Sequence, residues 1–221
     1  FDIQFLQIEN PETIQYVDQL KVNNSCFFRM YQIGKDSPET RAKAILISKA
    51  IEQPFYTEMR TNQQLGYVVW SYPRPQDDTY YLNFLIQSGD YPADDLNQRA
   101  DRLILTLPNL IANMSDESFQ QLIDSEVETL ERKPLSVSER AAKNKVIIFE
   151  HEGDFSRNKK TIESLKKVEK ESLAAYMEKI ISEETRKMIN VLAFAENHEN
   201  KSGEQSSFSS LSDWKSTRLY K

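Results

Sequence analysis

The chain has 221 residues, of which 39% are hydrophobic and 28% charged, and its formal net charge is −6. This composition is typical of a globular domain, and the net negative charge argues against a nucleic-acid partner. No apolar run approaches the roughly 18 residues needed to cross a bilayer, so we expect no membrane insertion. The single cysteine, Cys26, excludes an internal disulfide and is expected to be a small structural residue.

The first predicted strand covers residues 25–33, a short run rich in aromatic side chains. Residues 1–24 precede it and do not begin with methionine, so we expect the chain to be a piece of a longer polypeptide. The sequence Ser-Pro-Glu at 37–39 supplies an N-cap, a first-turn proline and a first-turn acid for a helix. Pro54 is expected to kink or restart this helix, whose second piece runs to about Asn62.

Two further strands are predicted at 67–72 and 79–87, joined by turn residues. Strand character returns at 188–195. The pattern between these strands predicts helices, at about 93–114 with a bend at Pro108, 116–132, 137–150, 157–166 and 169–182.

Hairpin-linked strands followed by a run of helices predict an α+β domain. We expect an antiparallel sheet of about four strands with helices packed on one face. The domain is predicted to span residues 25–195, and the polar residues 196–221 to form a linker and C-terminal tail.

Several self-contained active sites are excluded by the sequence. His151 and His198 are the only histidines, they lie far apart, and neither begins an H-x-x-E-H, whereas a helical zinc peptidase site needs two histidines one turn apart. There is no G-x-S-x-G, phosphate loop or dinucleotide fingerprint, and Cys26 has no candidate base nearby. We therefore expect no metal or cofactor in this chain and no enzymatic activity from the chain alone.

The stretch MRTNQQLGYVV, residues 59–69, places polar side chains at a helix-to-strand junction. From the residues alone, Arg60 is interpreted as a cation at a helix C-terminus and Tyr67 as a half-buried strand aromatic. Capping or packing is the simpler account of the two glutamines. Gly66 is expected to let the backbone turn tightly beside a ligand.

This stretch resembles the R-x-x-x-Q-L-G-Y-x-V segment of the insulysin/pitrilysin group of zinc peptidases, within the insulinase superfamily. Three neighbouring segments also look like their counterparts in that family: the upstream helix ISKAIEQPFYTEM, the downstream strand YYLNFLIQS, and the helical segment between SDESFQQ and HEGDF. The resemblance therefore covers about residues 25–195. Such enzymes have two homologous halves, each of two α+β domains, which close around a chamber. The N-terminal half carries the inverted H-x-x-E-H zinc site. The resemblance implies that this chain is the last of the four domains, in the half without zinc, and that residues 1–24 are a residual segment from the preceding domain or linker.

The resemblance also implies roles for Arg60 and Tyr67, because the corresponding residues of the family reach the zinc site of the other half. Tyr67 would be catalytic and substrate-binding as a donor to the oxyanion, and Arg60 would bind the substrate. The implied partners are a peptide substrate and the N-terminal catalytic half of the same polypeptide, which binds the zinc.

Two alternatives stay open: a non-catalytic scaffold or assembly domain of the same fold, and a free-standing peptide-binding domain. The compartment is open too, because bacterial relatives are periplasmic and eukaryotic ones cytosolic.

Overall fold

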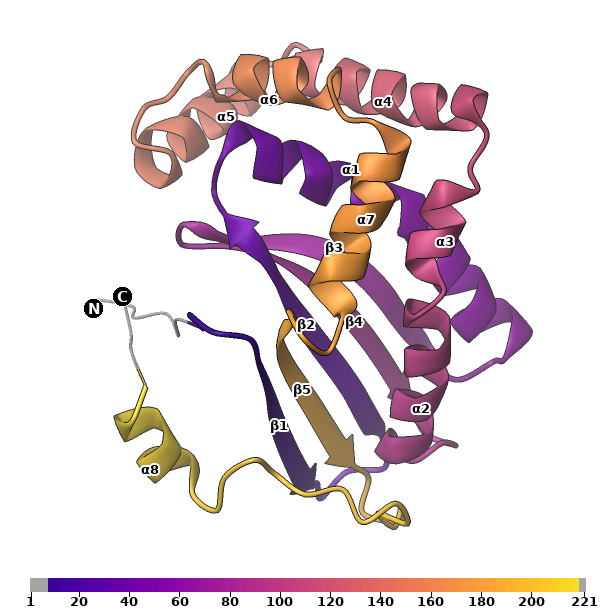
Figure 1. The fold of residues 1–221 in the computed structure, drawn as a ribbon. Helices are drawn as coiled ribbons and strands as arrows, with labels where there is room; N and C mark the ends of the chain where they lie inside the picture. The colour runs from indigo at the N-terminus through magenta and orange to yellow at the C-terminus, as the bar shows by residue number, and fades with distance from the viewer. Residues whose placement is uncertain (1–7, 219–221) are drawn as a thin grey trace.

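The described residues, 8–218 of a computed structural model, are organised around one five-stranded sheet (Figure 1). The strand order is β1-β5-β2-β4-β3. The strands are β1 (Glu12–Gln19), β2 (Ser25–Lys35), β3 (Val68–Gln76), β4 (Thr79–Ser88) and β5 (Lys187–Phe194). Helices pack on one face of this sheet, so the predicted α+β class is confirmed.

The sheet differs from the predicted one in two respects. It has five strands rather than about four, and it is mixed, because β1 pairs in parallel with β5 while the other pairs are antiparallel. The additional strand, β1, lies within the segment that we expected to be left over from a preceding part of the polypeptide. Its pattern is weak because Ile14 is the only buried residue of the strand, so alternation did not reveal it.

The helices begin close to the predicted positions. Ser37, Ser115 and Ser136 each accept a hydrogen bond from the backbone N–H three residues later, as N-caps do. None of the helices within residues 8–218 is long and apolar enough to cross a bilayer. The helices of the described residues are α1 (Pro38–Tyr56), the π-helix η1 (Thr57–Asn62), α2 (Ala93–Ile104), α3 (Leu107–Ala112), α4 (Asp116–Glu131), α5 (Val137–Glu150), α6 (Arg157–Leu165), α7 (Lys170–Ile181) and α8 (Leu211–Ser216).

The two prolines expected to disturb helices act differently. The helix predicted at 93–114 is divided into α2 and α3, with Pro108 in the first turn of α3, where a proline is tolerated. At Pro54 the expected restart is wrong, since α1 continues through it. Proline supplies no N–H to the preceding turn, and the helix changes to the wider π-helical form at Thr57.

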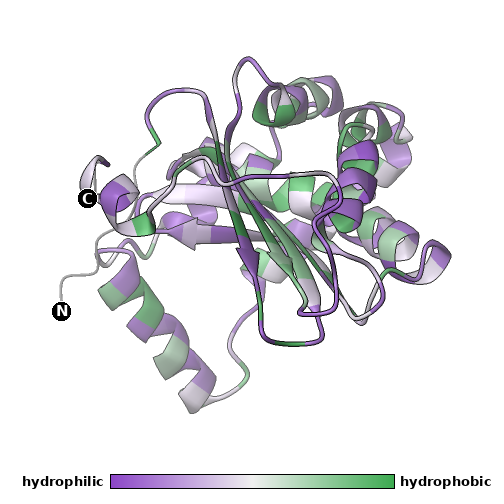
Figure 2. Ribbon diagram, turned by 90° about the horizontal axis from the view of Figure 1, so that it is seen from below, coloured by the Kyte–Doolittle hydropathy of each residue, from purple (hydrophilic) through white to green (hydrophobic). Residues whose placement is uncertain are grey.

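The core lies between α1 and the sheet. Hydrophobic residues concentrate on the strands in the middle of the molecule (Figure 2). Phe55, near the end of α1, is fully buried, and its ring centroid lies 5.0 Å from that of Phe84 in β4. Burying one such side chain stabilises the fold by about 1.5–3 kcal/mol. This packing fixes the C-terminal end of α1 against β4.

The C-terminal segment covers the outer edge of β1. The Ser207 backbone N–H donates to the Gln15 carbonyl at 2.8 Å, and the Ser207 hydroxyl accepts from the Gln15 N–H at 2.9 Å. The Val17 N–H donates to the Ser206 hydroxyl at 2.8 Å. The predicted linker therefore contributes hydrogen bonds to the free side of an edge strand.

Aromatic contacts hold the same segment. The Phe208 ring lies between Tyr16 and Trp214, with centroid separations of 6.0 and 4.9 Å. Trp214 of α8 therefore contacts the sheet edge through the ring of Phe208.

An ion-pair network ties the start of α1 to α6. The Asp36 carboxylate accepts from Arg41 at 2.8 Å and from Arg157 at 2.6 Å, and Arg157 also donates to the Tyr80 hydroxyl at 3.1 Å. Burial raises the pKa of Asp36, but hydrogen bonds from Arg157 and Arg41 outweigh it and hold the pKa below its usual 3.8.

Asp36→Asn is expected to lower the free energy of unfolding by about 3 kcal/mol, because it leaves two largely buried guanidinium groups without their carboxylate. Since the folded-state pKa of Asp36 is depressed, its stabilisation is complete above the unfolded pKa and is lost as pH falls through the folded pKa. The difference in unfolding free energy between wild type and variant should therefore become smaller below about pH 4.

Urea unfolding from pH 7 down to the lowest pH at which the chain is folded measures this difference. Glu52→Gln is the control: Glu52 pairs with Lys49 on the surface, and losing that pair should cost less than about 1 kcal/mol. A difference for Asp36→Asn that does not vary with pH would contradict the prediction.

Candidate functional site

The segment that connects α1 to β3 has unusual backbone geometry. In and after η1, the Gln63 N–H donates to the Glu58 carbonyl and the Leu65 N–H to the Met59 carbonyl, both at 3.0 Å. Met59 and Leu65 are fully buried, which anchors the segment. Gln64 has φ of 52°, a left-handed conformation that is uncommon without glycine. Wide helical turns and such residues are frequent at functional sites.

Gly66 is required by a close backbone approach. A Cβ at this position would lie 1.9 Å from the carbonyl oxygen of Gln87 in β4. Glycine therefore lets the connecting segment pass directly against β4. This contact is sufficient to require glycine at this position.

Arg60 and Tyr67 come together at this junction. The Arg60 guanidinium carbon lies 5.5 Å from the centroid of the Tyr67 ring, within the range of a cation–π interaction. Tyr67 is 87% exposed, so the interpretation as a half-buried strand aromatic is wrong. The residue stands just before β3, where η1 and Gly66 direct the chain outwards. Within residues 8–218, its hydroxyl has no hydrogen-bond partner.

Both side chains line an open hollow of about 660 Å³. A hollow of this size is in the range of ligand-binding clefts. It is lined by Tyr56, Arg60, Thr61, Gln64, Gly66, Tyr67, Gly89 and Asp90.

Polar contacts behind the hollow support η1. The Gln63 amide donates to Glu58 at 2.8 Å and accepts from Arg99 of α2 at 3.2 Å. Asn62 also donates to Glu58, and the hydrogen bonds from Asn62 and Gln63 lower the pKa of Glu58. Gln63 therefore contacts neighbouring side chains, as the interpretation of capping or packing expects. Arg99 was not foreseen as part of this region, because it is distant in sequence.

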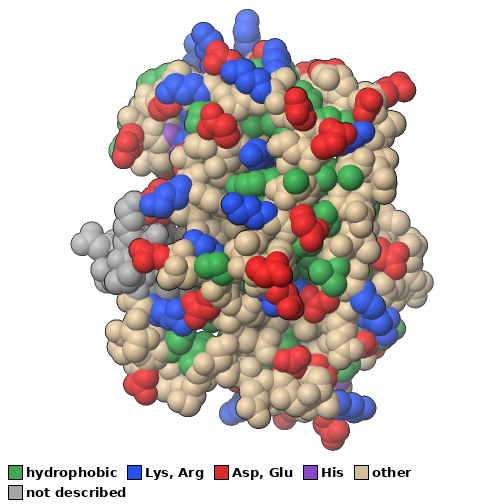
Figure 3. Space-filling model, in the orientation of Figure 1, with side chains coloured by type: hydrophobic (Ala, Val, Ile, Leu, Met, Phe, Trp, Pro, Cys, Tyr) green, Lys and Arg blue, Asp and Glu red, His purple; other side chains and the backbone are tan. Residues whose placement is uncertain are grey.

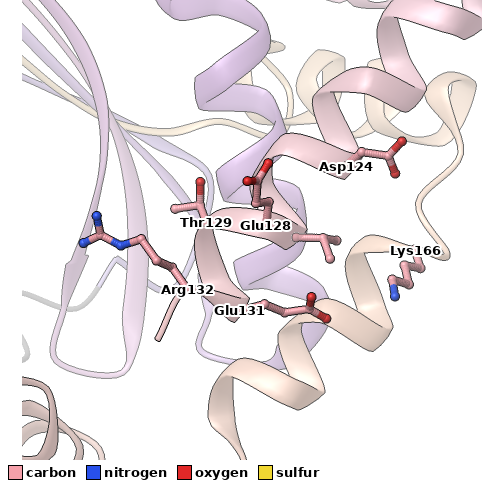
Figure 4. A pocket seen from close by; sticks show the side chains of 7 residues that line it. Asp124, Glu128, Thr129, Glu131, Arg132 and Lys166 are labelled. Atoms are coloured by element: carbon pink, nitrogen blue, oxygen red, sulfur yellow. The ribbon is translucent and has the colours of Figure 1, made fainter. Parts of the chain in front are cut away.

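Two other surface features within residues 8–218 do not form a comparable site. A hollow of about 620 Å³ beside α4 is lined by charged residues, among them Glu131, Arg132 and Lys166, whose side chains point in different directions (Figure 4). On the face seen in Figure 3, positive and negative side chains are interspersed, which does not suit a phosphate backbone.

The residues that the structure describes do not fit a zinc site. Among the described residues there is no group of three or more His, Cys, Asp or Glu side chains placed to hold a metal. His198 lies 2.8 Å from the Ser25 hydroxyl through Nδ1, and His151 follows the last turn of α5. Cys26 is half-buried, and burial raises the pKa of its thiol, which opposes nucleophilic reactivity.

Comparison with known proteins indicates which family this chain resembles. A family model described as PQQ synthase PqqF-like, C-terminal lobe domain 4, matches residues 46–145, which include Arg60 and Tyr67. Human insulin-degrading enzyme is 27% identical over 183 residues, which cover 81% of this chain and 18% of that enzyme. These comparisons support a C-terminal domain of the insulinase family. The prediction of a C-terminal domain of this family is thereby confirmed.

Solved structures show the same fold. The crystal structure of pitrilysin superposes with a TM-score of 0.82 at 18% identity, covering 99% of this chain and 24% of the pitrilysin chain. A peptidase M16 inactive domain from Pseudomonas fluorescens gives a TM-score of 0.62 at 14% identity, covering 90% of this chain and 47% of that one. The chain thus spans less than half of the length of each of these relatives, and the activity of a whole enzyme is a proposal for it.

Proposed function

We propose that this chain is the catalytically incomplete C-terminal domain of an insulinase-family zinc endopeptidase. In this proposal it contributes substrate binding and oxyanion stabilisation, while the zinc site lies in the N-terminal half of the same polypeptide. The observation that carries the proposal is the exposed Tyr67, stacked against Arg60 in an open hollow, with a hydroxyl that no described residue engages. A tyrosine in such a position is available to a ligand.

The chemistry of the two side chains suits peptide hydrolysis. When a peptide carbonyl is attacked, negative charge develops on its oxygen, and a phenol O–H directed at that oxygen stabilises the charge. Arg60 is permanently charged and offers several N–H donors, which suit the carbonyl oxygens of a peptide main chain. Its position over the ring of Tyr67 also restricts the orientation of the phenol.

Arg60→Met in the full-length polypeptide is expected to raise KM about tenfold and to change kcat less, because a charged donor to the bound peptide is lost in ground and transition state alike. Steady-state hydrolysis of a fluorogenic peptide measures both constants. The matched control is Arg74→Met, since Arg74 is exposed on β3 beyond the hollow. An equal rise of KM in both variants would show a general effect of charge and would contradict a specific contact.

Activity measurements distinguish the proposed function from the scaffold alternative. The structural relative from Pseudomonas fluorescens is an inactive domain of the same fold, so the fold does not require catalysis. If the full-length polypeptide cleaves no peptide, the scaffold function is correct. If it cleaves peptides and this chain alone does not, the proposed contribution from a catalytically incomplete domain is supported.

A further inference from the structure

The hollow beside η1 has a second side, which is formed by the connection between β4 and α2. Gly89 and Asp90 of this connection line the hollow. The close passage of Gly66 against Gln87, at the end of β4, brings the two sides together. Both residues to which the proposed function assigns a role lie on the other side, on η1 and the segment that follows it.

Asp90 presents an unpaired carboxylate to the hollow. The residue is exposed, and within residues 8–218 no hydrogen bond or ion pair engages its carboxylate. The carboxylates of the neighbouring helix α2 are all engaged: Asp94 accepts from the Ser202 N–H, Asp95 from Arg99 and Asp101 from Arg29. The negative charge of Asp90 is therefore available to a group that enters the hollow.

The main chain at Asp90 is held by a buried anchor. The Ser88 hydroxyl accepts hydrogen bonds from the Asp90 N–H at 3.2 Å and from the Tyr91 N–H at 3.0 Å. Ser88 is only 1% exposed. Because the anchor is buried, the carboxylate projects from a fixed point of the backbone and not from a loose loop.

Arg99 of α2 joins the two sides of the hollow. Its guanidinium carbon lies 4.9 Å from the ring centroid of Tyr91, the residue that directly follows Asp90. The same guanidinium donates to the Gln63 side chain, at the end of η1, at 3.2 Å. One side chain thus contacts both segments, which maintains the spacing between Asp90 and the residues of η1.

The two sides of the hollow carry opposite charges. Arg60 stacks on Tyr67 on one side and Asp90 lies on the other, and no ion pair joins Arg60 to Asp90 within the described residues. A cationic group is attracted by the carboxylate and repelled by the guanidinium, whereas a carbonyl oxygen is attracted by the guanidinium. A peptide with a basic side chain therefore has one favoured orientation in the hollow.

We propose that Asp90 is a specificity-determining residue, which binds an arginine or lysine side chain of the peptide close to the bond that is cleaved. This inference rests on the proposed function and deepens it, because it names the class of peptide. The preferred substrate has a basic side chain that reaches Asp90 while the main chain lies beside Arg60 and Tyr67.

The test compares peptides that differ only in charge. Citrulline has a urea group in place of the guanidinium of arginine, so the two residues have nearly the same shape. An acetylated, amidated and otherwise uncharged fluorogenic peptide carries arginine or citrulline at one position at a time, on both sides of the cleaved bond. With the full-length polypeptide, kcat/KM should be at least about fivefold higher for arginine at one position or two adjacent ones, and this ratio should fall as salt is added.

Protein variants assign the preference to Asp90. Asp90→Asn should bring the ratio of arginine to citrulline close to one, and Asp90→Lys should reverse it. The matched control is Asp77→Asn, because Asp77 is an exposed acid in the turn at the other end of β3 and β4, and it should keep the ratio of the wild type. Both peptides are measured with the same preparation, so the ratio does not depend on how much of a variant is folded.

Two results would overturn the assignment of Asp90. One is a ratio close to one at every position with the wild type. The other is a ratio that Asp90→Asn leaves unchanged while it slows both peptides alike, which would mean that Asp90 acts on Arg60 or on the fold and not on the substrate.

The two proposals fail separately. Tyr67→Phe should slow hydrolysis of both peptides and leave their ratio unchanged, so a normal turnover by this variant contradicts only the catalytic role. If the full-length polypeptide cleaves no peptide, the proposed function fails, and the dissociation constants of the same peptides still test Asp90. A preference for the arginine peptide in binding that Asp90→Asn abolishes supports the role of Asp90, and equal binding of the two peptides refutes it.

Discussion

Tyr67→Phe in the full-length polypeptide is expected to lower kcat about 100- to 1000-fold, and kcat/KM equally, because one donor to the oxyanion is removed. The oxyanion exists only on the way to the transition state, so substrate binding should change little. Because Tyr67 is 87% exposed, removing its hydroxyl should leave folding intact. Phenylalanine also preserves the ring beneath Arg60.

Steady-state kinetics and thermal melting of the same preparation measure the effect of this substitution. Tyr16→Phe is the matched control, because the Tyr16 hydroxyl donates to Asp18 on β1, at the opposite edge of the sheet. Its kcat should equal that of the wild type. A near-normal kcat for Tyr67→Phe would contradict the catalytic role, whatever happened to the melting temperature.

Gly66→Ala is expected to destabilise the domain by about 3 kcal/mol, because the new methyl group overlaps the main chain and not a movable side chain. Its Cβ would lie 1.9 Å from the Gln87 carbonyl oxygen and 2.9 Å from the Gln87 carbonyl carbon. Relief requires the connecting segment to move away from β4, which also moves Tyr67. Activity should therefore fall together with stability.

Urea unfolding of the 221-residue chain measures the cost of Gly66→Ala. Gly89→Ala is the control, since a Cβ there would have its nearest contact, the Asn24 side-chain oxygen, at an ordinary 3.4 Å. The control should change the free energy of unfolding by less than about 1 kcal/mol. Equal losses of unfolding free energy in the two variants would show that the close approach to β4 does not determine the effect of Gly66→Ala.

Local signals in the sequence were sufficient for most of the elements. The caps at Ser37, Ser115 and Ser136 were predictable because a short polar side chain before an apolar-periodic segment satisfies the first free N–H groups of a helix. Strand β1 was not predictable in this way. It is held by its pairing with β5 and by the C-terminal segment, both distant in sequence, and it buries only Ile14.

For the candidate site, the sequence indicated two residues but not their geometry. The motif containing Arg60 and Tyr67 indicated the two residues, and the structure brings them side by side. Alternation alone placed Tyr67 half-buried in a strand, whereas the π-helical end of α1 and the close passage of Gly66 leave it exposed. The support from Arg99 depends on a tertiary contact between α2 and η1, for which no local pattern exists.

The central proposal is that Arg60 and Tyr67 act on the substrate and not on the metal. The most direct test is the turnover number and zinc content of the full-length polypeptide carrying both Arg60→Met and Tyr67→Phe. We predict an undiminished zinc content, an unchanged melting temperature, and a turnover number at least about 100-fold below that of the wild type. Turnover within twofold of the wild type, or a loss of zinc in parallel with activity, would contradict this account.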